Sequence, residues 1–271
     1  MTEQAGHRVS TQRGWEYLRR LRFSKRMVRP CHVKADPQAQ DVFKKTEPEC
    51  RATPKEHGHM TKNIARIIIP DSQLAKDAAD VLHEYGSLLL WNHSHRVFLF
   101  GSLFGRQEKL GYDPELLYIS ALFHDLGLTS HYRSPDKRFE VDGANAARSF
   151  LEQHGIAHEA TRLVWDAIAL HTTRGVAQYK EPVVALLYRG VVFDVIGDHF
   201  AELSEETRSQ VVSAFPREGF KQKILQTFLD GFRHKPETAY GNINADICER
   251  YLPGYKRPNY CDFVLQSPWN E

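Results

Sequence analysis

Four short segments of this sequence place histidine or aspartate in strongly apolar surroundings. His93 lies in an amphipathic stretch, adjacent His124 and Asp125 end an apolar stretch, His171 ends another, and Asp194 lies within a hydrophobic run. A buried aspartate without a partner is costly, so Asp194 needs a cationic neighbour. A divalent metal ion bound by imidazole and carboxylate groups would satisfy these residues together. Any one of them alone would more simply be a hydrogen-bonded core residue.

The segments that carry these residues have the periodicity of helices. From Ile67 onward apolar residues recur at steps of three and four, and the run Ile67–Pro70 is too short to build a sheet. Asp71 or Ser72 is expected to cap the first helix, and Asp113 with Pro114 to begin the third. We expect helices at about 72–85, 88–104, 115–126, 142–154, 159–173, 182–199, 204–214 and 218–233. The predicted fold class is all-α.

The position of His124 and Asp125 at the end of their helix affects what they can bind. Neighbouring residues inside a helix point about 100° apart. At a frayed end before Gly127, both side chains can turn toward one ion.

Length and composition favour a soluble enzyme with one sizeable core. The chain has 271 residues, no apolar run as long as a membrane span, and no secretory signal at its N-terminus. Its four cysteines form no CxxC pair, which favours reduced thiols. We therefore expect a cytoplasmic protein with no membrane partner, and leave open whether it forms a homo-oligomer.

The first 66 residues differ from the rest. They hold fifteen Lys and Arg against seven Asp and Glu, a net charge of about +8, which leaves about −6 for the remainder. The segment Arg19–Arg26 could contact nucleic acid or an anionic membrane. We interpret residues 1–66 as an irregular, partly ordered basic arm with a short helix around Trp15–Met27, and expect no nucleic-acid partner. Residues 67–271 are then the helical enzyme with a C-terminal extension.

The order of the motifs resembles the HD superfamily of metal-dependent hydrolases. A histidine is followed about thirty residues later by His-Asp, and then by a distant aspartate in a buried helix. The resemblance covers roughly residues 70–235 and implies an HD-domain helical bundle. The wider sequence is most similar to the cyanamide hydratase branch, in the stretches Ile69–Ser72, Asn92–Val97, Phe139–Ala144, Ile168–Thr172, Asn259–Asp262 and Ser267–Trp269.

By this resemblance, His93, His124, Asp125 and Asp194 would hold the metal. Two-metal HD proteins usually carry a histidine where this chain has Phe139, so we expect a single divalent ion. The ligand types suit Zn²⁺ or Fe²⁺ and do not separate the two.

Further residues beside the motifs are expected to assist the reaction. His171 would relay a proton or orient the substrate, or would instead be a core histidine at a helix end. Thr172 would hold the substrate, and Glu140 would fix a ligand histidine or be an exposed loop residue. Asn92 flanks His93. Arg96 lies one turn after His93, where it would pair with a carboxylate or receive an anionic substrate.

The resemblance implies a small-molecule substrate, and we expect hydration of a small nitrile such as cyanamide to urea. The pocket should then be tight, apolar and poor in cations, and the apolar residues nearest the motifs are Leu89, Phe123, Leu128, Phe139 and Leu170. One alternative is an HD phosphohydrolase acting on a nucleotide or another phosphomonoester. A second alternative is a non-catalytic binding module that keeps its metal for structure.

Overall fold

A computed structural model describes residues 63–268, which lie within a compact unit spanning His59–Glu271. The predicted helix around Trp15–Met27 and nearly all of the predicted basic arm lie outside the described residues. Only residues 63–66 of that arm are described, and they belong to a hairpin with the residues that follow.

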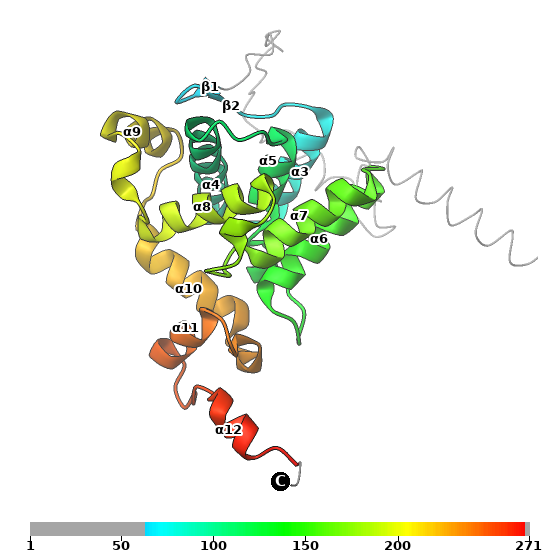
Figure 1. The fold of residues 1–271 in the computed structure, drawn as a ribbon, viewed down its shortest axis with the longest axis vertical. Helices are drawn as coiled ribbons and strands as arrows, with labels where there is room; N and C mark the ends of the chain where they lie inside the picture. Colours follow the sequence, from blue (N-terminus) through cyan, green and yellow to red (C-terminus); the bar gives the residue numbers. More distant parts are fainter. Residues whose placement is uncertain (1–62, 269–271) are drawn as a thin grey trace, which may run out of the picture. The chain divides into compact units, whose positions relative to one another are not determined.

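The described residues are mainly helical, and their one sheet has two short strands, which confirms the all-α prediction (Figure 1). The α-helices are α3 (Gln73–Tyr85), α4 (Leu88–Gln107), α5 (Pro114–Phe123), α6 (Phe139–Gln153), α7 (His158–Leu170), α8 (Pro182–Ile196), α9 (Glu205–Ala214), α10 (Phe220–Phe232), α11 (Asn244–Tyr251) and α12 (Tyr260–Leu265). Short 3-10 helices are η1 (Leu126–Leu128), η2 (Ala177–Tyr179), η3 (Phe200–Glu202) and η4 (Pro236–Ala239). The last two α-helices were not predicted. Within residues 63–268, every helix is too short or too polar for a membrane span.

The prediction that the run beginning at Ile67 forms no sheet is wrong for its first two residues. Strand β2 (Ile67–Ile68) pairs antiparallel with β1 (Asn63–Ile64). Ala65 and Arg66 form the turn between them with φ angles of 50° and 65°. Ile64 and Ile67 are both buried, so this small hairpin contributes to the core.

The helix starts follow the predicted caps. Ser72 Oγ accepts a hydrogen bond from the amide of Ala75 at 3.0 Å, and Asp113 Oδ1 accepts one from the amide of Glu115 at 2.8 Å, with Pro114 at the first helical position. Each cap satisfies an amide that lacks an intrahelical partner.

Three helices end earlier than predicted: α5 at Phe123, α7 at Leu170 and α8 at Ile196. After α5 and α7, the side chains of His124 and His171 bond back to main-chain carbonyls three residues earlier. After α8, Gly197 adopts the left-handed conformation with φ of 71°, which stops the helix. His124, Asp125 and His171 therefore lie just after helix ends.

Helices α4 and α8 pack closely against each other, and α6 packs along α7 (Figure 1). At the α4–α8 crossing, a Cβ added to Gly190 would lie only 2.3 Å from the carbonyl oxygen of Val97. The missing side chain lets the two backbones approach, and this crossing sets residues of α4 opposite Asp194 on α8.

We predict that Gly190→Ala destabilises the fold. The added methyl group meets backbone, so α4 and α8 must separate, at a cost of about 1–3 kcal/mol. This exceeds the gain of about 1 kcal/mol that alanine brings to a helix interior. Chemical denaturation measures the free energy of unfolding.

Gly111→Ala is the matched control, because a Cβ there would meet no atom within 4 Å. It should change the free energy of unfolding by no more than about 0.5 kcal/mol. Equal effects of the two substitutions would contradict the close-approach argument.

Candidate metal centre

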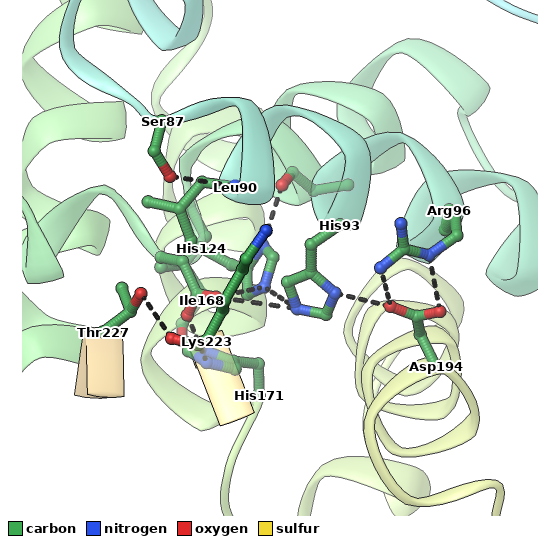
Figure 2. Close-up of polar contacts among 12 residues, drawn as sticks. Ser87, Leu90, His93, Arg96, His124, Ile168, His171, Asp194, Lys223 and Thr227 are labelled. Carbon is green, nitrogen blue, oxygen red and sulfur yellow. Dashed lines mark hydrogen bonds and ion pairs between the residues drawn. The ribbon is translucent and has the colours of Figure 1, made fainter. Parts of the chain in front are cut away.

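The histidines and aspartates singled out from the sequence converge from four helices. His93 lies on α4, His124 caps α5 and precedes Asp125, His171 caps α7, and Asp194 lies on α8. All five residues are almost completely buried. In Figure 2 the ring of His93 has His124 on one side and Asp194 on the other.

Hydrogen bonds fix which ring nitrogens of two histidines are free. Nδ1 of His93 lies 2.7 Å from Oδ2 of Asp194, and Nδ1 of His124 lies 2.8 Å from the carbonyl oxygen of Ala121. Since both partners are acceptors, each Nδ1 carries the proton, and Nε2 of each neutral ring is left with a lone pair. These two Nε2 atoms face each other at 3.2 Å.

Asp125 completes this cluster of acceptors. Its Oδ2 lies 3.6 Å from Nε2 of His93 and 3.3 Å from Nε2 of His124. Both of its carboxylate oxygens are buried without a hydrogen-bond donor among the described residues. Ligands of a tetrahedral zinc ion lie about 3.4 Å apart, close to these separations. Among residues 63–268, no other such group of three metal-ligating side chains occurs, so the donor set fits a divalent metal.

The electrostatics of the cluster also favour a positive charge. Burial by itself lowers the pKa of His124, but the adjacent carboxylate of Asp125 outweighs burial and raises it. Burial by itself raises the pKa of Asp125, but His124 outweighs it and holds this pKa well below its usual range. Asp125 therefore stays ionised and draws a cation toward the two Nε2 atoms.

The structure does not bring Asp194 into this cluster. Its carboxylate lies behind the ring of His93, where Arg96 binds both oxygens at 2.8 and 2.9 Å and Arg217 also binds Oδ1. The cationic neighbour expected for Asp194 is thus a pair of arginines. A direct ligand role for Asp194 stays a prediction; its contacts fit a carboxylate that orients a ligand histidine. Arg96 takes the first of its two expected roles and is fully buried, away from any substrate.

His171 lies beside the cluster and presents its free nitrogen to it. Its Nδ1 donates to the carbonyl of Ile168 at 2.6 Å, and its Nε2 lies 3.7 Å from Oδ1 of Asp125. Burial and the neighbouring His124 lower the pKa of His171 to about 4, so its ring is neutral near pH 7. The buried ring of Phe139 lies 5.6 Å from the His171 ring, centroid to centroid.

The other residues predicted to assist lie farther from the three acceptors. Glu140 is fully buried rather than exposed, and accepts hydrogen bonds from Thr172 at 2.6 Å and Arg138 at 2.7 Å. Within the described residues, Glu140 forms no hydrogen bond to His93 or His124. Thr172 lines the cavity beside the cluster, whereas Asn92 is half-buried on α4 and does not.

A cavity of about 170 Å³ opens onto His93, His124, Asp125 and His171. Its remaining wall is chiefly apolar and comes mostly from α8, through Tyr188, Val191, Val192, Val195 and Ile196, with Phe228, Ile243, Thr172 and Arg174. The expected apolar character is present, but the predicted residues are wrong: Leu89, Phe123, Leu128, Phe139 and Leu170 do not line it. Sequence neighbours of a ligand on a helix point elsewhere, because each residue turns by about 100°.

Arg217 was missed in the sequence. It lies 23 residues beyond Asp194, in the loop between α9 and α10, with no local pattern to single it out. The apolar wall was also missed, although residues 188, 191, 192 and 195 recur at helical spacing around Asp194. That spacing marks one face of α8 but does not show which cavity it borders.

We predict that His124→Ala and Asp125→Ala each abolish metal binding, because each removes one of three converging ligands. Metal affinity should fall by more than about 100-fold, since even partners behind a ligand contribute 10–100-fold. Elemental analysis after dialysis measures this. His131→Ala, an exposed residue whose ring stacks on Tyr85, is the control and should keep its metal. Full metal content in both ligand variants would place the site elsewhere.

We predict that Asp194→Asn weakens the site without removing it. The substitution leaves buried Arg96 without a counter-charge, which should cost about 3–5 kcal/mol in stability. It also loosens His93, so metal affinity should fall about 10–100-fold, while excess metal restores full occupancy. Calorimetric titration with metal measures both affinity and stoichiometry.

Asp246→Asn is the matched control, since Asp246 forms an exposed ion pair with Arg257 at 2.7 Å. Exposed pairs contribute about 0–1 kcal/mol, so stability and metal affinity should hardly change. If Asp194→Asn cannot bind metal even in excess, Asp194 is itself a ligand.

Comparison with known proteins agrees with this geometry. The family model of the HD domain matches residues 90–213, and that of a winged helix-turn-helix matches residues 1–47, which lie outside the described residues. A search of curated proteins finds no significant match. The matched segment contains His93, His124 and Asp125, the three converging acceptors. Residues 90–213 are therefore similar to the HD domain, and this similarity supports metal-dependent chemistry of the hydrolase type.

Proposed function

We propose that this protein is a metal-dependent hydratase that adds water to a small nitrile such as cyanamide, giving urea. The observation that carries the proposal is the cavity on the ligand cluster, which is small and walled mainly by valine, isoleucine and aromatic side chains. Such a cavity suits a compact, uncharged substrate. A phosphate group would need several cations around it, and Arg174 is the one cation among the lining residues.

His93, His124 and Asp125 would hold one divalent ion, Zn²⁺ or Fe²⁺. When bound, this ion supplies Lewis-acid activation, lowering the pKa of a coordinated water toward neutrality. A single ion is proposed because Phe139 presents a hydrocarbon ring beside His171 where a second ion would need a ligand.

His171 would move the proton. Its unprotonated Nε2 faces Asp125 and the cavity, so it can accept a proton from the attacking water as the C–O bond forms. The same proton then passes to the nitrile nitrogen, and tautomerisation of the resulting imidic acid gives the amide. The hydrogen bond from Nδ1 to the Ile168 carbonyl keeps the ring in the required tautomer.

The function is tested by incubating metal-loaded protein with cyanamide, aliphatic nitriles, nucleoside monophosphates and p-nitrophenyl phosphate. We predict metal-dependent formation of urea from cyanamide. His171→Ala should keep its metal but lose about 10²–10⁴-fold in turnover, because it removes the proton relay. His131→Ala should retain activity. A His171→Ala variant with full turnover would contradict the assigned role.

The alternative of a phosphomonoesterase has one observation in its favour. Arg174 lines the cavity and makes no hydrogen bond or ion pair with residues 63–268, so its guanidinium can receive an anion. Arg174→Ala distinguishes the two functions. For a nitrile substrate the ratio kcat/KM should change by less than about threefold, whereas loss of a phosphate clamp should cost about 10²-fold or more. Rapid metal-dependent phosphate release without cyanamide turnover would establish the alternative.

A further inference from the structure

A second cavity, of about 520 Å³, lies next to Asp194 and is distinct from the one on the metal ligands. Helix α8 takes part in both cavities: Val195 and Ile196 line both, while Asp194 lines only the second. The lining of the second cavity combines three cations with apolar and aromatic side chains: Arg208, Arg217, Lys221, Phe100, Phe193, Phe200 and Val212.

The positive charges of this cavity are not balanced by its lining. Asp194 is the only carboxylate that lines it, and Asp194 is already shared between Arg217 and the buried Arg96. One terminal nitrogen of Arg208 donates hydrogen bonds to the main-chain carbonyls of Phe200 and Leu203, which carry no net charge.

Lys221 adds a third cation. It is exposed and forms no hydrogen bond or ion pair with any residue from 63 to 268. Glu218, next to Arg217 in the sequence, is exposed and does not line the cavity. Cations gathered in one concave site raise the local concentration of anions.

Aromatic side chains provide the other half of the site. The guanidinium carbons of Arg208 and Arg217 lie 3.9 Å from the ring centroid of Phe200 and 4.4 Å from that of Phe220. Stacking on a ring holds a guanidinium in a defined orientation. Phe200 is 56% exposed although Arg208 and Phe193 contact its ring, so part of its surface is open to an apolar partner.

We propose that this cavity binds a small organic anion with an aromatic body. Its carboxylate or phosphate group would bind Arg217, Arg208 and Lys221, and its ring would pack on Phe200 and the neighbouring apolar side chains. The proposal does not depend on the reaction at the metal centre.

The position of the site couples it to the metal ligands. Arg217 binds the carboxylate of Asp194, which accepts a hydrogen bond from His93, whose other nitrogen faces the metal site. An anion that draws Arg217 toward itself weakens the ion pair between Arg217 and Asp194. Occupancy of the cavity and affinity for the metal should therefore be linked, and such linkage is reciprocal.

Titration calorimetry on the full chain tests the site, with phenyl phosphate, benzoate and inorganic phosphate as probes. Phenyl phosphate and benzoate should each bind more tightly than inorganic phosphate, and the stronger of the two identifies the charged group. Lys221→Ala should weaken binding about fivefold and Lys221→Glu further, as expected for loss and reversal of one exposed charge. Since Lys221 has no partner among the described residues, these variants should fold and retain their metal.

Two controls separate this site from the metal centre. Lys256→Ala removes an exposed lysine that lines neither cavity and should leave binding unchanged. His124→Ala, which lacks the metal, should still bind phenyl phosphate, with an affinity that differs only by the linkage to the metal. Binding that is lost in His124→Ala, or that is unaffected by Lys221→Glu, would overturn the proposal, because the anion would then be bound elsewhere.

Discussion

The carboxylate of Asp194 is bound from three directions, and much of the architecture around the site depends on it. Arg96 from α4 and Arg217 from the loop before α10 donate to its oxygens, and so does His93 from α4. Burial alone raises the pKa of Asp194, but the bonds from His93 and Arg96 hold it well below its usual range, so the carboxylate stays ionised. Arg96 also donates to two main-chain carbonyls in the α9–α10 loop. One buried charge thus ties three segments together.

The same hydrogen bonds create the chemistry of the site. Because Asp194 accepts a hydrogen bond from His93 Nδ1, the proton stays on that nitrogen, and the opposite nitrogen has a lone pair that points to His124 and Asp125. A main-chain carbonyl does the same for His124. Acceptors that converge in a buried space repel one another unless a cation lies between them, so the arrangement of His93, His124 and Asp125 fits a metal site.

Helix α8 separates two environments of opposite character. One side carries Tyr188 and the valines that line a small apolar cavity beside His93, His124 and Asp125. Beside Asp194 is a larger cavity lined by arginine, lysine and phenylalanine. The first suits a compact uncharged substrate and the second an anion. Since Asp194 lines one cavity and is hydrogen-bonded to His93, which lines the other, binding in one cavity can influence the other.

The sequence by itself determined the helical fold, the caps at Ser72 and Asp113, and the HD motif with its converging His93, His124 and Asp125. The fold and the caps follow from local rules of helical periodicity and capping chemistry, whereas the grouping of His93, His124 and Asp125 was expected from the resemblance of the motif order to the HD superfamily. Only the tertiary structure decided that the partners of Asp194 are Arg96 and Arg217, and that α8 supplies the cavity wall. The first outcome depends on Arg217, a loop residue far along the chain from Asp194, and on the crossing of α4 and α8. The crossing brings the two backbones into close contact at Gly190. Local periodicity gives the faces of a helix but not the neighbour that each face meets.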